Sequence, residues 1–188
     1  MLIQMLIAQP QMIGTILART PTWVWFLFAG LVGLGVSQLK TRTLSAVRAF
    51  LMPVAMTGLS LWGTVSAFSQ SAAFGQVMLV WVAAAVVLAA LIGRMAPPAG
   101  ASYRAQDRTF TVPGNWVPLA LIVAIFLVKY VGGIETAMNP GLTHDASYTL
   151  TYGAIYGAIS GIFTGRSIRL ARLALRTSSP VSAPIANA

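Results

Sequence analysis

Few side chains in this sequence could perform chemistry, and Lys129 has the most unusual setting among them. The residues before it are apolar for several helical turns, so the lysine falls within a hydrophobic helix. Charge in hydrocarbon is costly, and an ionisable residue there is by default a candidate for binding or transport. Lys129 could hold an anionic substrate or lipid. It could equally extend its ammonium to the membrane surface beside Tyr130, or pair with Glu135 near the end of the same helix.

Arg48 and a pair of tyrosines are the other polar positions in apolar surroundings. Arg48 is followed by Pro53, which removes a helical hydrogen bond and can kink the helix. A charge beside a kink can form a ligand site, although an arginine in this place can also bind lipid phosphate. Tyr152 and Tyr156 lie four residues apart, on one helical face. The sequence shows no partner for proton transfer beside them, so we interpret the pair as packing.

The sequence gives no support for an enzyme. Cysteine is absent, which excludes disulfides, thiolate metal ligands and cysteine nucleophiles, and one histidine is too few for a haem or a histidine-rich metal site. The chain has only three carboxylate side chains, which are few for acid–base catalysis: Asp107, Glu135 and Asp145. The motifs HExxH and GxSxG and a Walker loop do not occur. We therefore predict no catalytic, cofactor-binding or metal-binding residues and no cofactor.

The elements that position these residues are predicted to be membrane helices. Of 188 residues, 57% are hydrophobic and 8% are charged, and the mean hydropathy is +0.78. An ordinary soluble domain carries about 25% charged residues. A bilayer core of roughly 30 Å takes about 20 helical residues to cross, and five stretches lack charge for about that length. The expected spans are residues 22–39, 44–68, 72–93, 116–134 and 146–165.

The second and third spans come from one uncharged stretch, residues 49–93. As a single helix it would be about 68 Å long, twice what a bilayer needs. The polar cluster at residues 69–71 therefore supplies a turn. The fifth span is expected to continue as a basic helix to Arg176.

Three segments lie outside the predicted spans. Residues 1–18 are apolar but interrupted by Pro10 and Gly14, which favours an interfacial helix on the outer leaflet. The loop 95–115 alternates in polarity around residues 106–107, which predicts two short strands. The tail, residues 177–188, is small and polar, and we expect it to be disordered. The predicted fold is all-α: a bundle of about five transmembrane helices within residues 19–176, with an N-terminal interfacial helix and a short β-hairpin-like cytoplasmic loop.

The basic residues predict an orientation. The net charge is +9, and ten of the twelve basic residues follow spans one, three and five. These ten are Lys40, Arg42, Arg48, Arg94, Arg104, Arg108, Arg166, Arg169, Arg172 and Arg176. Because lysine and arginine are retained on the cytoplasmic side, the N-terminus is expected in the periplasm and the C-terminus in the cytoplasm of a bacterial inner membrane. The expected partners are anionic lipid headgroups rather than nucleic acid.

A stripe of glycines marks the fifth span as a packing helix. Gly153, Gly157, Gly161 and Gly165 recur every four residues, in the manner of a glycine zipper. Small residues on one stripe let a second helix approach closely. The partner could be another span of the same chain, with the glycines near residue 33 as one possibility, or a second copy in a homo-oligomer.

Four segments carry a resemblance: TPTWVWFLFAGL, RAFLMPVAMTGLSLWG, RTFTVPGNWVPLALIVAIFLVKY and YGAIYGAISGIFTGRSIRL. Together they resemble a family of small, uncharacterised proteobacterial inner-membrane proteins with a domain of unknown function, over about residues 20–176. More remotely, the basic residue and proline that open span two look like CcdC-type membrane proteins linked to cytochrome c biogenesis. That process uses thiols, so the resemblance implies an indirect role at most for a chain without cysteine. Neither likeness implies a catalytic residue.

These features lead to two hypotheses about function. The first is a non-enzymatic inner-membrane protein that acts through contacts with helices or lipids. The alternative is a small transporter or permease that binds an anionic ligand at Lys129, with Glu135 and Arg48 as further candidates for the ligand or lipid site.

Overall fold

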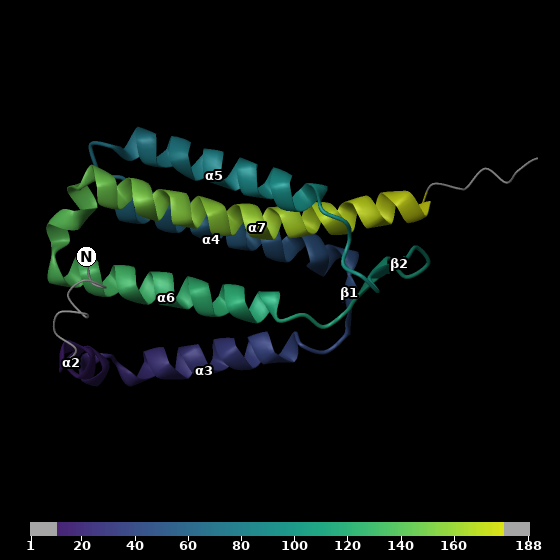
Figure 1. Ribbon diagram of the computed structural model, residues 1–188, viewed down its shortest axis with the longest axis horizontal. Helices are drawn as coiled ribbons and strands as arrows, with labels where there is room; N and C mark the ends of the chain where they lie inside the picture. Colours follow the sequence, from purple (N-terminus) through teal and green to yellow (C-terminus); the bar gives the residue numbers. More distant parts are fainter. Residues whose placement is uncertain (1–10, 179–188) are drawn as a thin grey trace, which may run out of the picture.

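Five long helices run alternately in opposite directions in the computed structural model, which describes residues 11–178 (Figure 1). They are α3 (Thr22–Ser37), α4 (Ala46–Phe68), α5 (Phe74–Arg94), α6 (Val117–Met138) and α7 (Ala146–Ser178). A short helix, α2 (Gln11–Arg19), precedes them, and a 3₁₀ helix, η1 (Pro140–His144), joins α6 to α7. Residues 1–10 of the predicted interfacial segment and 179–188 of the predicted tail lie outside the described residues.

The helices follow the predicted spans closely, with one clear difference at α4. It begins at Ala46 rather than at residue 44, because residues 42–45 form a strand instead. Among the described residues, α4, α5 and α6 are long and apolar enough to cross a membrane. The helix α3 is apolar but has only 16 residues. The 33-residue α7 has a basic last third and ends at Ser178, two residues beyond the expected end.

A small sheet closes one end of the bundle. Its strands are β1 (Arg42–Ser45), β2 (Ser102–Arg104) and β3 (Thr109–Val112), all antiparallel in the order β1-β3-β2. The predicted hairpin is therefore confirmed, while β1 was not predicted. We call this end of the bundle the sheet end and the opposite end, where α6 turns into α7, the η1 end.

The sheet is fixed to the bundle by Phe110. This side chain is fully buried, with its ring centroid 6.1 Å from that of Phe50 on α4 and 4.7 Å from that of Tyr103 on β2. Burying a phenylalanine stabilises a fold by roughly 1.5–3 kcal/mol. The aromatic contacts thus hold three segments, distant in sequence, at one place.

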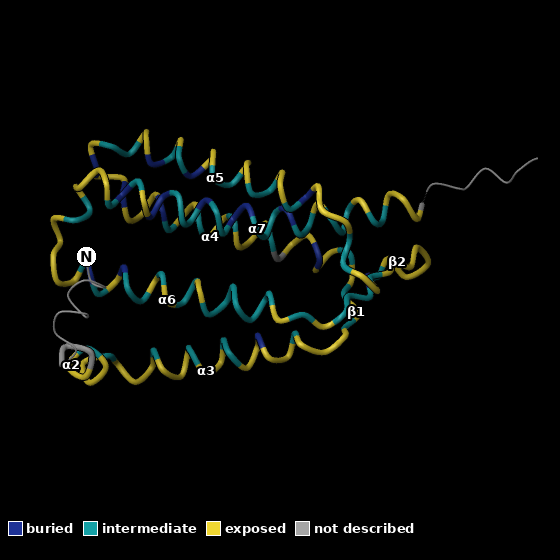
Figure 2. The backbone as a smooth tube through the Cα atoms, viewed as in Figure 1, coloured by how far each residue is buried: buried dark blue, intermediate teal, exposed yellow. Residues whose placement is uncertain are grey.

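The helices form two groups. In the first, α7 packs along α5 and α4, and in the second α6 packs along α3. Buried residues concentrate in the first group, as Figure 2 shows, and Phe68, Val77 and Tyr152 form its core cluster. The second group joins the first through the sheet at one end, through η1 at the other, and through long side chains between them.

The glycine stripe of α7 faces α5. A Cβ on Gly157 would overlap the carbonyl oxygen of Trp81, and one on Gly153 would lie 2.9 Å from a methyl carbon of Val77. Gly161 and Gly165 face the next turns of α5 in the same way. The helix α3, which is the first predicted span, is not the partner of this stripe. Its Gly35 packs instead against Leu119 of α6.

Candidate functional site

Two charged side chains and three tyrosines lie where α6 faces α7, near the η1 end. From α6 come Lys129, Gly132 and Glu135, spaced by three residues, and from α7 come Tyr148, Tyr152 and Tyr156, spaced by four. Residues three and four apart share one face of a helix, so two polar stripes meet. We call these six residues the α6–α7 seam.

Lys129 directs its ammonium into the bundle. The Nζ atom lies 4.3 Å from the centroid of the Tyr156 ring, within the range of a cation–π contact. The space for it is provided by Gly63 of α4, where an added Cβ would lie 3.0 Å from that Nζ. The ammonium is thus flanked by two helices of the other group, and Gly63 keeps the position open.

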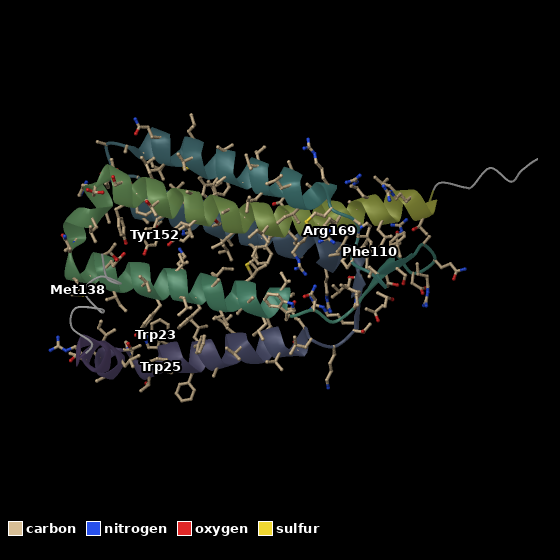
Figure 3. The ribbon with its side chains drawn as sticks, in the orientation of Figure 1. Trp23, Trp25, Phe110, Met138, Tyr152 and Arg169 are labelled. Atoms are coloured by element: carbon tan, nitrogen blue, oxygen red, sulfur yellow. The ribbon has the colours of Figure 1, made fainter. Side chains whose placement is uncertain are left out.

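Glu135 lies one and a half turns further along α6 and is also turned inward. Tyr152 donates a hydrogen bond from its hydroxyl to Oε2 of Glu135 at 3.2 Å, and both residues are buried. Gly132 admits the Tyr152 ring, because a Cβ there would lie 2.8 Å from the ring carbon Cε1. The ring centroid of Tyr148 lies 4.6 Å from that of Tyr152. A second tyrosine hydroxyl is therefore near the Glu135 carboxylate. Figure 3 labels Tyr152 at this position.

A groove on the other side of α6 reaches the same lysine. It has a volume of about 780 Å³ and lies between α2, α3 and α6. Its walls are mainly apolar, and Trp23 and Met138, both labelled in Figure 3, belong to them. Lys129 itself lines the groove and is exposed, and its ammonium also lies beside the Tyr156 ring.

The rim of this groove is more polar than its walls. Arg19, Thr20 and Tyr130 all line it, and the hydroxyl oxygens of Thr20 and Tyr130 share a hydrogen bond of 2.6 Å. This bond ties the turn between α2 and α3 to α6. Chemically, the groove combines an apolar interior with two cationic side chains, which suits an amphipathic anion.

Comparison with known proteins gives one result. The family described as "Family of unknown function (DUF6622)" matches residues 1–181. The chain belongs to DUF6622. No curated protein and no solved structure matches it. Membership in DUF6622 therefore assigns no activity to the seam.

The structure of this DUF6622 member brings together only some of the residues that the sequence singles out. Lys129 and Glu135 share the α6–α7 seam, whereas Arg48 is exposed at the sheet end, where its backbone amide donates to the side chain of Ser45 at 3.4 Å. Tyr152 and Tyr156 do pack in the core, as interpreted, and each also contacts a charged side chain of α6. Their partners come from α6, and sequence reasoning does not reveal which faces of two helices meet.

Tyr148 of the seam and its neighbour Gly63 on α4 were missed. Tyr148 continues the spacing of four that joins Tyr152 and Tyr156, so this signal was present in the sequence. Gly63 carries no comparable signal, because its role depends on a lysine that reaches it from another helix.

Proposed function

We propose that this DUF6622 member is a multi-pass protein of the bacterial inner membrane that acts without catalysis, through contacts with lipids and other helices. The outer surface of the bundle carries this proposal. Phe26, Trp62 and Leu79, on three different helices, are 78%, 74% and 70% exposed. A soluble monomer rarely presents so extended an apolar surface, whereas lipid tails solvate it well.

Five crossings are the arrangement that we propose. The helices α4, α5 and α6 have the length and composition for three of them. The helix α3 covers about 24 Å, which local thinning of the bilayer accommodates. The first 20 or so residues of α7 cover about 30 Å before Arg166, which supports a fifth crossing.

The charge distribution supports an orientation with the sheet end in the cytoplasm. Ten basic residues either follow α3, α5 or the apolar part of α7, or lie in the sheet. All of these segments meet at the sheet end. At the η1 end, Arg19 and Asp145 are the charged residues outside the seam. The N-terminus is then periplasmic and the C-terminus cytoplasmic.

Single cysteines test this topology cleanly, because the chain has none of its own. We expect a membrane-impermeant maleimide to label Gln70→Cys, in the exposed α4–α5 turn, in intact spheroplasts. Gln106→Cys, at the tip of the β2–β3 hairpin, should be labelled only after permeabilisation. The reverse pattern would refute the orientation, and release of the protein by alkaline carbonate would refute membrane integration.

The DUF6622 match carries no information on the source organism or on cytochrome c biogenesis. Placement in the inner membrane of a proteobacterium is therefore part of the proposal. A role like that of CcdC-type proteins is not, because no contact in the structure supports it.

The second candidate function is a small permease that binds an anionic ligand, and the position of Lys129 favours it. The ammonium contacts the Tyr156 ring, and the same residue lines the 780 Å³ groove. If Lys129 extended to the membrane surface instead, its ammonium would not contact the ring of Tyr156. The cation beside an apolar groove fits a ligand with a hydrocarbon body and one anionic group.

Oleate and oleyl alcohol test this candidate, because they share the hydrocarbon chain and differ in the headgroup, a charged carboxylate against a neutral hydroxyl. Tryptophan fluorescence should report oleate binding, since Trp23 lines the groove. We expect Lys129→Met to weaken oleate binding about tenfold, the value of one charge-assisted hydrogen bond, and to leave oleyl alcohol unchanged. Lys40→Met, which removes an exposed lysine at the sheet end, is the matched control. Equal oleate affinity in both variants would exclude an anion site at Lys129.

A further inference from the structure

A second concentration of charge lies at the sheet end, where α7 passes the linker between β3 and α6. A cavity of about 300 Å³ opens there. Its lining includes Arg166 and Arg169 of α7 and the linker residues Gly114 and Asn115. Pockets for small ligands usually measure about 300–1,000 Å³, so this cavity has room for one compact group. Figure 3 labels Arg169 in this region.

The positive charge around this cavity has no negative partner. Arg166 is half-buried, and its guanidinium makes no hydrogen bond or ion pair with residues 11–178. Burial and the positive charges of Arg169 and Arg42 together lower its pKa. Of the three acids in the chain, Asp107 pairs with Arg104 at 3.4 Å on the exposed hairpin. The other two acids lie near the η1 end, so within residues 11–178 no other side-chain carboxylate is available to neutralise these arginines.

The arginines and the linker are held in place by other contacts. Arg169 donates from Nε to the carbonyl oxygen of Ala96 at 2.9 Å, with a second bond from its NH2 group to the same atom. Arg42 donates to Oε1 of Gln38 at 2.8 Å, and burial lowers the pKa of this arginine too. These bonds leave the remaining guanidinium donors of both side chains available.

Asn115 brings a neutral donor to the same cavity. Its backbone amide donates to the carbonyl oxygen of Gln38 at 3.2 Å, and its Oδ1 accepts from the amide of Val117 at 2.9 Å. The side-chain NH₂ group is then free to donate. Gly114 keeps the linker against the segment that follows α3, because a Cβ there would overlap the carbonyl oxygen of Leu39.

We propose that this cavity binds a phosphate group, held by Arg166 and Arg169 with help from the side-chain amide of Asn115. The planar fork of a guanidinium matches the oxygens of phosphate, and two such forks with an amide supply donors from several sides. The phosphate belongs either to the headgroup of an anionic phospholipid or to a soluble compound. The lipid source rests on the proposed membrane function, since it requires the sheet end to lie at a bilayer surface.

Arg166→Gln is the variant that tests the site. It removes the one arginine of the cavity that lacks a protein partner, so the fold should be retained. Arg94→Gln is the matched control, because Arg94 is exposed at the same end, has the same charge and does not line the cavity. The purified full chain in dodecyl maltoside would be titrated with inorganic phosphate, followed by thermal shift, and with phosphatidylglycerol, followed by native mass spectrometry. Chloride at equal ionic strength separates a specific effect from screening.

We expect Arg166→Gln to weaken phosphate or phosphatidylglycerol binding about tenfold, with Arg94→Gln within about twofold of the wild type. Loss in the phosphatidylglycerol titration alone assigns a lipid headgroup, and loss in the phosphate titration alone assigns a soluble compound. Loss in both identifies the phosphate group itself as the recognised element. No binding in either titration, or equal losses in the two variants, overturns the proposal.

A second variant and an independent readout complete the test. Arg166→Lys keeps the charge but not the fork, and it should bind several-fold more weakly than the wild type. If Arg166→Gln does not fold, unchanged affinity in Arg166→Lys overturns the proposal. Labelling of Gln70→Cys and Gln106→Cys is independent of this site. A failed phosphate site therefore leaves the topology result standing, and a failed topology leaves phosphate binding in detergent measurable.

Discussion

At the scale of single residues, the contact between Glu135 and Tyr152 is the most informative one. A carboxylate buried in a helical bundle is costly unless donors surround it. Tyr152 supplies one of them across the gap between α6 and α7, at 3.2 Å. This bond joins the two helix groups at a place where their backbones do not pack closely.

Tyr152→Phe removes that bond without changing the shape of the side chain. Hydrogen bonds between membrane helices contribute roughly 0.6–1.7 kcal/mol, so we expect a loss of about 1 kcal/mol in the free energy of unfolding. The melting temperature in detergent should fall by a few degrees. Thr151→Val is the control, because Thr151 is exposed and its hydroxyl bonds only within α7. Equal stability of the two variants would contradict a structural role for the bond.

Sequence reasoning found part of the seam and missed the rest for a physical reason. Lys129 and Glu135 stand out because a charge in an apolar helix is visible without any partner. The tyrosines and Gly63 become meaningful only once the rotation of three helices is known. That rotation is set by the packing of the glycine stripe on α5, which is a long-range property.

At the scale of elements, the pair of α5 and α7 organises the larger helix group. Its close approach depends on the absence of side chains at the stripe, and Gly157 has the least space of the four, since a Cβ there would overlap the backbone of Trp81. The contacts with α5 account for all four glycines within one chain. The geometry therefore favours packing within the chain over a homodimer seam.

Gly157→Ala should destabilise the protein, and Gly30→Ala should not. The added methyl group meets backbone at residue 157, and overpacking of this kind costs about 1–3 kcal/mol. Nothing lies within 4 Å of a Cβ at Gly30, and alanine in a helix is favoured over glycine by about 0.5–1 kcal/mol. Thermal unfolding in detergent separates the two. A change of oligomeric size in Gly157→Ala with unchanged stability would instead indicate a dimer seam.

The sheet shows where local patterns were not sufficient. Alternating polarity predicted β2 and β3, but β1 has only four residues and runs directly into an apolar helix, so the sequence looked like a helix start. What makes residues 42–45 a strand is their pairing with β3, for example Leu44 with Phe110. Pairing between strands that are distant in the sequence leaves little signal in the residue pattern of either strand.

Phe110→Ala should remove the anchor of this sheet. The side chain is fully buried between Phe50 and Tyr103, and truncating a buried phenylalanine costs about 3–5 kcal/mol. We expect a lower melting temperature and faster hydrogen exchange of the β3 amides. Phe26→Ala, at a position 78% exposed on α3, should change neither. Equal effects of the two variants would show that the sheet does not depend on Phe110.

At the scale of the whole molecule, the excess of positive charge is concentrated at one end. The net charge is +9, and ten of the twelve basic residues belong to the sheet end. Like charges held together destabilise the compact state through mutual repulsion. A membrane with anionic lipid would relieve that repulsion, but a neutral detergent micelle does not.

Stability in neutral detergent should therefore rise with ionic strength. The Debye length falls from about 30 Å at 0.01 M salt to about 8 Å at 0.15 M, so most repulsion between the separate arginines is screened over this range. We expect the melting temperature to increase with sodium chloride and not with sucrose of equal osmolality. Replacing the exposed residues Arg104, Arg108 and Arg176 by glutamine should shrink the increase, because it lowers the charge at the sheet end. A melting temperature that falls with salt in both proteins would show that attractive ion pairs, rather than unrelieved repulsion, dominate this end of the bundle.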